Sequence, residues 1–596
     1  MFGLSLLFWG VLMAAPTQTN TATTQFHKQL ESDWNYWVAQ YPEFATQLGR
    51  TEYDARWTDY SPAAIDARAA YLRTSARNLA AISRNTLNAA DQVSYDLYRE
   101  LLESAVQGLD LHYDAQPIRS VVPTHLLMPV NQLGGIQQDV PRIVAIMRSD
   151  TVKDYETIIA RLEAVSPLVD QTIALMERGL AAGITQPRVV MRGVPDQVQG
   201  QIASDPDASP LLDAFDRFPA SIAQADRDRL TARARAAYSK QVAPAFTRLK
   251  DFLEKSYLSK CREAIPITEI PKGDALYRYN VAWHTTTALT PKEIHQIGLD
   301  EVKRIRGEMD EVIAASGFKG TFAEFTQFLR TDPQFYFTTA DALVTEYRDI
   351  AKRADPELSR LFGMLPRLTY GVRQVPAAIA PAQTTAYYEP GSPAAGRAGN
   401  MYVNTYKLDS RPKWEMEALT LHEAVPGHHL QIALAQELHN MPEFRKQGSY
   451  TAYVEGWALY SELLGEDMGF YTSPYSKFGQ LTYQMWRAVR LVVDTGMHSF
   501  GWSRERSIEF FRENSAKTEQ DITVEIDRYI AWPGQALGYK IGELRIRQLR
   551  AKAEKALGSR FDIRAFHDTI QAEGAVPLGL LETRIDAWIR AKQARQ

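Results

Sequence analysis

The chain has 596 residues, of which 45% are hydrophobic and 23% charged, and this composition is that of a globular protein rather than a disordered or fibrous one. Its 67 lysine and arginine residues against 71 aspartate and glutamate residues give a net charge of -4. This balance, with no long basic run, argues against a nucleic-acid partner. The single cysteine, Cys261, excludes an intramolecular disulfide and any cysteine-based metal cluster, and we expect it to be a structural or surface thiol.

At the N-terminus, residues 2–15 form an uncharged, mostly apolar run that ends in small residues and is followed by polar ones. As a helix the run would span about 21 Å, short of the ~30 Å hydrocarbon core of a bilayer. It resembles a signal peptide covering residues 1–15, although no lysine or arginine precedes it. We therefore predict a secreted or periplasmic protein with no stable membrane span after cleavage; an uncleaved membrane tether is the alternative. No cysteine follows the run to carry a lipid anchor.

Most of the remaining chain has helical periodicity. Thr290 followed by Pro291 and Glu293 is a strong helix start, with threonine as the N-cap and glutamate three residues later. Thr321 and Glu324 repeat this pattern. Apolar residues then recur at helical spacing after the first start, at Ile294, Ile297, Val302, Ile305, Met309 and Val312. The region from about 25 to 260 has the same character, with a loop expected at 203–210.

Three segments differ from this pattern. Residues 368–375, 384–388 and 400–406 are rich in β-branched and aromatic residues and are bounded by proline or glycine, so they predict a small sheet within about 366–406. The sequence thus predicts a mainly α fold. A helical N-terminal part, 16–270, would form one continuous unit with a part at 271–596 that carries the chemistry.

Three of the eleven histidines lie within eight residues, at His422, His428 and His429. Zinc peptidases commonly use His-Glu-x-x-His, because positions i and i+4 share a helix face. Here six residues separate His422 from His428, which on a regular helix turns the rings to different faces, and His429 lies about 10.5 Å from His422 along the axis. Pro426 and Gly427 predict a local bulge that returns a second imidazole to His422. We expect one Zn²⁺ per chain, against the alternative of a helix that merely contains histidines.

A catalytic zinc site also needs a third protein ligand and an open position for water. Glu455, in a helical stretch 27 residues after His428, is the candidate, because that gap lets a second helix return alongside the first. Glu462 and Glu466 are rivals, and we expect both to be solvated helical carboxylates. Glu423, next to His422, is the candidate general base.

The segments 422–431 (HEAVPGHHLQ) and 455–460 (EGWALY), together with 399–404 and 532–542, resemble a large bacterial family labelled as a domain of unknown function. That family is similar to helical zinc peptidases of the thimet-oligopeptidase, angiotensin-converting and thermostable-metallocarboxypeptidase types. The resemblance implies a large helical domain with a deep cleft, and two histidines and one glutamate on the zinc. The relatives' Gly-His matches Gly427-His428, which favours His428 over His429. It further implies that the strand at 400–405 pairs with an extended peptide.

The relatives also supply a tyrosine or histidine near the C-terminus to bind the oxyanion. Tyr539, Tyr529 and His498 are the candidates here, and a packing role is the alternative for each. Arg490, Asp494 and His498 recur every four residues along one helix stripe. This stripe is either an interhelical charge network or a functional group of residues, which would support a ligand histidine or bind a substrate carboxylate.

The leading hypothesis is a zinc metallopeptidase that hydrolyses short peptides, as an oligopeptidase or a carboxypeptidase. A non-peptidase zinc hydrolase acting on amides or esters is one alternative, and an inert metal-binding protein is another. Glu423 beside His422 argues against the inert alternative, because a structural metal site does not need a base.

Overall fold

The computed structural model describes residues 21–594 except 118–121, 378–379, 381–382, 394–395 and 440. The expected signal peptide, residues 1–15, lies outside this part. The N-terminal part consists of helices α1 (Thr21–Gln40), α2 (Pro42–Gln47), α3 (Pro62–Ala80), α4 (Ala89–Leu109), α5 (Ile136–Ala145), α6 (Val152–Glu163), α7 (Val165–Ala182), α8 (Val194–Gln199), α9 (Gln224–Ala237) and α10 (Ala243–Phe252).

The C-terminal part has more helices and a small sheet. Its helices are α11 (Gly273–Thr285), α12 (Pro291–Ala315), α13 (Phe322–Thr331), α14 (Ala340–Ala354), α15 (Leu358–Leu361), α16 (Met416–Glu423), α17 (His428–Gln436), α18 (Glu443–Lys446), α19 (Thr451–Asp467), α20 (Pro474–Ser499), α21 (Arg504–Asn514), α22 (Glu519–Ala531), α23 (Leu537–Leu557), α24 (Ile563–Gln571) and α25 (Leu578–Ala594). The predicted mainly α fold is confirmed.

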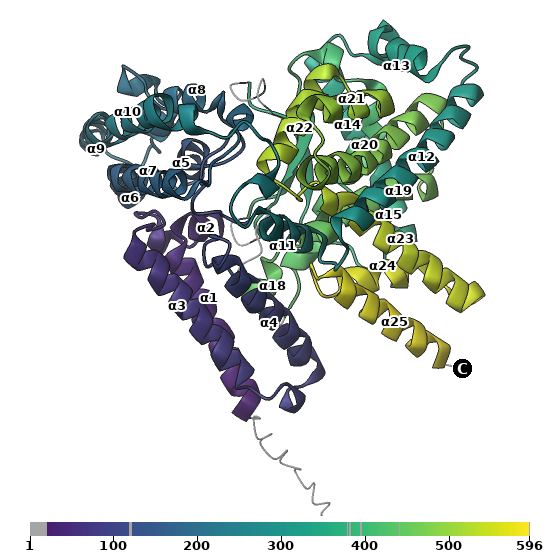
Figure 1. Ribbon diagram of the computed structural model, residues 1–596, viewed down its shortest axis with the longest axis horizontal. Helices are drawn as coiled ribbons and strands as arrows, with labels where there is room; N and C mark the ends of the chain where they lie inside the picture. Colours follow the sequence, from purple (N-terminus) through teal and green to yellow (C-terminus); the bar gives the residue numbers. More distant parts are fainter. Residues whose placement is uncertain are drawn as a thin grey trace, which may run out of the picture.

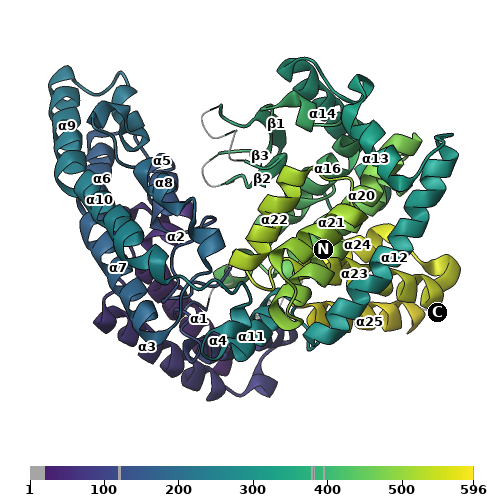
Figure 2. The ribbon, with the colours of Figure 1, turned by 45° about the horizontal axis from the view of Figure 1, so that its top comes forward.

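The molecule has the outline of an open V. Figure 1 shows α1, α3 and α4 running alongside one another, apart from the group α5–α10. In Figure 2 the α5–α10 group forms one arm, and the C-terminal part forms the other, with the sheet and α22 on the side that faces the first arm. Helices α1–α4 and α11 lie near the base where the arms meet. Within the part of the chain that the structure describes, no helix combines the length and apolar character needed to cross a membrane.

Helix starts follow the capping chemistry of the sequence. The Thr290 backbone N–H donates to Glu293 Oε2 at 2.8 Å, and the Glu293 N–H donates to Thr290 Oγ1 at 3.3 Å, so α12 begins with the predicted capping box. Thr321 caps α13 in the same way. Along α12 the predicted residues Ile294, Val302, Ile305 and Met309 are buried, whereas Ile297 and Val312 are only partly buried and the adjacent Gly298 and Ile313 lie on the buried face.

Helix α20 is the central element of the C-terminal part, and most of its 26 residues are buried around the whole circumference. A helix buried on all sides belongs to the core of a large protein. Gly298 of α12 lets the two helices approach closely, because a Cβ there would lie 2.7 Å from the Leu491 Cβ. Figure 1 shows α12 beside α20.

The three predicted strands form one sheet, with β1 (Tyr370–Gln374), β2 (Ala386–Glu389) and β3 (Gly399–Val403) in the order β1-β3-β2. Strand β3 pairs with β1 in parallel and with β2 in antiparallel. The expectation that strand 400–405 pairs with a peptide is therefore wrong, because both of its edges are already hydrogen-bonded within the sheet. The free edges belong to β1 and β2.

Cys261 is buried, and burial raises the pKa of its thiol to about 12. A thiol that stays protonated is a poor nucleophile, which fits the structural role expected for it.

Candidate metal centre

The helix that carries the histidine motif is interrupted rather than bulged. Helix α16 ends at Glu423, and α17 begins at His428. Gly427 is required at this break, because a Cβ there would lie 1.9 Å from the carbonyl oxygen of His422. The Trp457 Nε1–H donates to the Pro426 carbonyl oxygen at 2.9 Å and holds the connection against α19. The break places the His422 and His428 rings with centroids 4.9 Å apart and planes at 89°.

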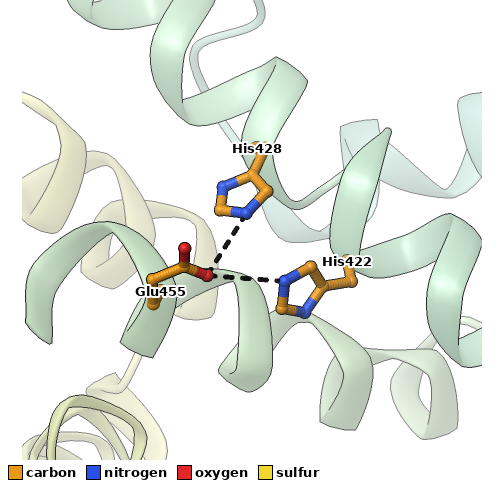
Figure 3. Close-up of side chains that lie close together, drawn as sticks. All are labelled: His422, His428 and Glu455. Carbon is orange, nitrogen blue, oxygen red and sulfur yellow. Dashed lines mark ion pairs between the residues drawn. The ribbon is translucent and has the colours of Figure 1, made fainter. Parts of the chain in front are cut away.

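The structure brings together the three residues proposed as metal ligands. Glu455 Oε2 of α19 lies 3.6 Å from His422 Nε2 and 3.4 Å from His428 Nε2 (Figure 3). One ligand atom from each of the three lies within 4.8 Å of the others. Two imidazoles and one carboxylate are the donor set of catalytic zinc sites in several hydrolases. The Glu455 side chain keeps 20% of its surface exposed, so the cluster is reached from solvent.

His429 does not join the cluster. Its Nε2 contacts the Leu368 carbonyl oxygen at 3.1 Å, and its Nδ1 lies 2.9 Å from the Tyr388 hydroxyl of β2. Burial lowers the pKa of His429 to about 4, so the ring is neutral. Nε2–H therefore donates to Leu368 and Nδ1 accepts from Tyr388. The geometry selects His428 of the two adjacent histidines, and His429 ties α17 to the sheet.

Glu462 proves to be a partner of His422 rather than a solvated carboxylate, and this part of the sequence prediction is wrong. It is fully buried, and its Oε1 lies 2.8 Å from His422 Nδ1. With Nδ1 facing a carboxylate, Nε2 of the same ring is left to face Glu455. A carboxylate behind a histidine in this way fixes the tautomer and orientation of a metal ligand. Glu466 is exposed and pairs with Lys477, as expected.

Spacing could have identified Glu462. It lies seven residues after Glu455, which is close to two full helical turns, so both carboxylates project from one face of α19. The Tyr471 hydroxyl donates to the Glu462 carbonyl oxygen at 2.6 Å, and Arg487 Nη2 lies 3.7 Å from Glu462 Oε1. These contacts hold the second carboxylate in a buried position that the sequence of α19 alone does not reveal.

Protonation in the cluster follows from these carboxylates. Burial would lower the pKa of His422, but hydrogen bonds to Glu455 and Glu462 outweigh it and raise the pKa to about 9. Burial would raise the pKa of Glu455, but the two histidines hold it well below its usual range. Without a metal, the cluster therefore holds a proton on His422 at neutral pH.

Glu423 is the last residue of α16 and does not belong to the ligand trio. Burial raises its pKa, and the neighbouring His422 and His428 oppose the rise. A carboxyl group with a raised pKa next to a metal centre is the kind of group that enzymes use as an acid or base.

Tyr539 lies near the cluster because of a close helix crossing. Helices α19 and α23 meet at two glycines, where a Cβ on Gly456 would lie 2.6 Å from the Gly542 backbone. Tyr539 of α23 and Glu455 of α19 both adjoin this crossing. Burial raises the pKa of the Tyr539 hydroxyl, and the charge of Glu455 raises it further.

Tyr529 and His498 have other partners. The Tyr529 hydroxyl donates to Glu525 Oε2 at 2.5 Å and accepts from Arg490 Nε at 2.9 Å, and the residue is fully buried. The Ile267 backbone N–H donates to His498 Nδ1 at 3.1 Å, and His498 Nε2 lies 3.1 Å from the Tyr529 carbonyl oxygen. Both ring nitrogens of His498 thus form hydrogen bonds with the backbone. Neither is left to donate to an oxyanion, and the residue has a packing role.

Asp494 completes the predicted stripe of α20. It accepts hydrogen bonds from the Tyr277 hydroxyl at 2.6 Å and from the Gly534 backbone N–H at 3.1 Å. Burial raises its pKa to about 7. Asp494 and His498 therefore follow the network interpretation of the stripe, whereas Arg490 lies against the Tyr539 ring, with its guanidinium carbon 4.4 Å from the ring centroid.

The expected deep cleft stays a prediction. A concavity of about 600 Å³ lies between α12, α19, α20 and α23, and its lining does not include His422, His428 or Glu455. It is lined by oppositely charged side chains such as Arg550 and Asp467, which pair with each other at 3.0 Å. This concavity is a polar surface groove separate from the candidate metal centre.

The chain belongs to the family described as "Bacterial protein of unknown function (DUF885)", whose model matches residues 42–585. A crystal structure from Colwellia psychrerythraea is similar, with a TM-score of 0.88 and 29% identity over 96% of this chain and 100% of that one. A structure from Shewanella oneidensis has a TM-score of 0.70 and 17% identity over 95% of this chain and 99% of that one, and this likeness concerns the fold alone. Both are described as a "putative lipoprotein", the second of unknown function. No curated protein matches the chain.

Proposed function

We propose that this protein is a zinc-dependent metallopeptidase that hydrolyses short peptides. The observation that carries the proposal is the convergence of His422, His428 and Glu455, with Glu423 adjacent to the first ligand and outside the trio. A buried carboxylate behind His422 adds support, because a ligand oriented in this way is typical of metal sites.

Each residue then has a definite part in the reaction. His422, His428 and Glu455 would hold the zinc ion, which supplies a polarised water and polarises the scissile carbonyl. Glu423 takes the proton of the water and passes it to the leaving amine. Tyr539, next to Glu455 at the α19–α23 crossing, is the candidate donor to the oxyanion.

Digestion of a defined peptide library, with and without a chelator, tests the proposal. We expect cleavage that the chelator abolishes and that zinc restores. Cleavage of simple amides or esters but of no peptide would favour the other hydrolase, and the absence of any cleavage by zinc-loaded protein would favour an inert metal-binding protein.

Zinc content separates ligands from neighbours. We expect one zinc per chain, lost in the His422→Ala, His428→Ala and Glu455→Ala variants and retained in His429→Ala. Loss in His429→Ala but not in His428→Ala would overturn the ligand assignment.

Glu423→Gln tests the base. The variant keeps its size and hydrogen-bonding capacity but cannot accept the proton, so we expect peptide hydrolysis to fall by at least about two orders of magnitude, mainly in kcat. Zinc content and melting temperature should not change, because Glu423 is not a ligand. Hydrolysis at a near-normal rate would exclude Glu423 as the base.

We also propose that the protein is exported to the periplasm or secreted. The apolar run at residues 2–15 and the description of the similar Colwellia protein as a "putative lipoprotein" support this location. N-terminal sequencing of protein from the native host should find a start near Ala15 or Pro16. Soluble cytoplasmic protein that retains Met1 would contradict the proposal.

A further inference from the structure

Two arginines near the candidate metal centre, the buried Arg490 and the partly buried Arg528, share one carboxylate. Arg490 Nη2 of α20 and Arg528 Nη2 of α22 each lie 3.0 Å from Glu525 Oε2. Arg528 also donates to the Gln535 side-chain oxygen at 2.6 Å. Among the described residues, these two guanidinium groups form ion pairs with Glu525 alone, and Asp494 also interacts electrostatically with Arg528.

One edge of Arg490 is left without a partner. Its Nε donates to the Tyr529 hydroxyl and its Nη2 to Glu525, but its Nη1 is buried and has no hydrogen-bond partner among the described residues. The side chain is only 4% exposed. An unpaired buried charged donor lowers the stability of the folded state, because it has lost its hydrogen bonds to water. A ligand that accepts from Nη1 would therefore be favoured.

The free edge lies beside the residues of the proposed reaction. The Arg490 guanidinium carbon lies 4.4 Å from the centroid of the Tyr539 ring and 4.8 Å from that of Trp486. Tyr539 follows Gly538, whose Cβ would contact Thr451 and Ala452 at the start of α19, the helix that carries Glu455. Besides burial, the charges of Glu455 and Arg490 both act on the pKa of the Tyr539 hydroxyl, so Tyr539 lies near the cation and near the metal cluster.

The neighbours of Arg490 hold its guanidinium in place and keep Glu525 away from Nη1. Glu525 is fixed by Arg528 at 3.0 Å and by the Tyr529 hydroxyl at 2.5 Å, so it is not free to swing toward Nη1. The aromatic faces of Tyr539 and Trp486 restrict the guanidinium to one plane. A rigid guanidinium with one unpaired edge is prearranged for a planar anion.

We propose that Arg490, held by Glu525 and Tyr529 and accompanied by Arg528, binds a carboxylate of the peptide substrate next to the metal centre. The proposal rests on the proposed function. The carboxylate comes either from the C-terminus of the peptide or from an acidic side chain, and the first source would make the enzyme a carboxypeptidase or a peptidyl-dipeptidase.

Matched peptides test the subsite in the unaltered, zinc-loaded protein. One pair differs only in a C-terminal acid or amide, and a second pair, with amidated ends, differs only in a glutamate or glutamine side chain. We expect kcat/KM to be at least tenfold higher for the acid in one of the two pairs, and that pair identifies the source. Ratios near one in both pairs would overturn the proposal while leaving the peptidase activity in place.

Variants then assign the effect to Arg490. In Arg490→Gln, kcat/KM for the preferred acid peptide should fall to the value for its neutral partner. Arg490→Lys should restore part of the preference. Arg504→Gln is the matched control, because Arg504 of α21 pairs at 2.6 Å with Asp527 of α22, the helix that also carries Arg528, and none of its described ion pairs involves the cluster. A preference unchanged in Arg490→Gln would exclude Arg490 as the binding group.

Calorimetry with the same peptides and zinc-loaded Glu423→Gln protein measures binding without turnover. It therefore tests the carboxylate subsite independently of the proposed peptidase activity. Carboxylate-dependent binding without any cleavage by the unaltered protein would remove the proposed activity and keep the subsite. Cleavage with equal binding of acid and neutral peptides would do the reverse.

Discussion

Glu462 shows how much a single buried side chain contributes to the candidate site. Its carboxylate faces His422 Nδ1 and Arg487, and the Tyr471 hydroxyl donates to its backbone carbonyl oxygen. The three ligands could be predicted from the sequence, because histidine clustering and the interval to Glu455 are properties of the chain itself. The spacing of seven residues places Glu462 on the same face of α19 as Glu455. Its burial was not predicted, because it depends on contacts from outside α19, such as that of Arg487 on α20.

Replacement of Glu462 by glutamine should weaken zinc binding by about 10- to 100-fold, as is typical when the partner of a ligand histidine is changed. The glutamine can still accept from Nδ1 but no longer carries the charge that makes His422 basic. Competition with a chelating dye measures the affinity. Glu466→Gln, one turn further along α19 and exposed, is the control and should bind zinc normally. Equal affinities of the two variants would contradict the role given to Glu462.

Zinc affinity should also depend on pH through His422. Its pKa of about 9 in the metal-free protein lies above neutral pH, so the ring must lose a proton before it can bind the ion. Affinity should therefore rise by about tenfold per pH unit between pH 6 and 8 and level off near pH 9. Dye competition across this range, after correction for the dye, measures the slope. An affinity that is flat from pH 6 to 8 would show that His422 is already neutral.

At the scale of elements, capping boxes and strands follow the sequence closely. Thr290 and Thr321 start helices where predicted, and all three strands form within three residues of their expected ends. The pairing order was not predicted, because a strand pattern states which residues face the core and not which strand lies in the middle. The helix break was expected as a bulge, and the close approach of Gly427 to the His422 carbonyl separates α16 from α17 instead.

A glycine-to-alanine substitution, which adds one methyl group, tests how closely α19 and α23 pack at their crossing. In Gly456→Ala the added Cβ would lie 2.6 Å from the Gly542 backbone, so the helices must move apart, at a cost of about 1–3 kcal/mol. We expect a lower melting temperature and weaker zinc binding, because Glu455 is the neighbouring residue. Gly307→Ala, in α12 with open space around it, is the control and should raise stability by about 0.5–1 kcal/mol. A stable Gly456→Ala variant with normal zinc affinity would contradict the tight crossing.

At the scale of the whole molecule, the candidate metal centre joins three helices of one arm of the V. His422 comes from α16, His428 from α17 and Glu455 from α19, and these helices pack against the buried α20 or the sheet. An ion that binds only the folded state stabilises it by about 4 kcal/mol at a thousandfold excess over the dissociation constant. Metal binding should therefore be visible in global stability.

Removal of zinc with a chelator should lower the melting temperature by several degrees, and added zinc should restore it. His429→Ala should still show this difference between the metal-free and zinc-loaded forms, whereas His428→Ala should show none. Differential scanning fluorimetry on both variants provides the measurement. A chelator effect of equal size in His428→Ala would mean that the stabilising ion binds elsewhere.

The break between α16 and α17 makes the candidate metal centre adjustable in a way that a continuous helix does not allow. On an unbroken helix, the rise and twist of the backbone alone set the separation of two histidines. Here a four-residue connection sets it, and Trp457, two residues after Glu455, holds that connection through the Pro426 carbonyl. A tilt of α19 would therefore displace the Glu455 carboxylate and the His428 imidazole together. The distances between the three ligands would then depend on the position of this one helix.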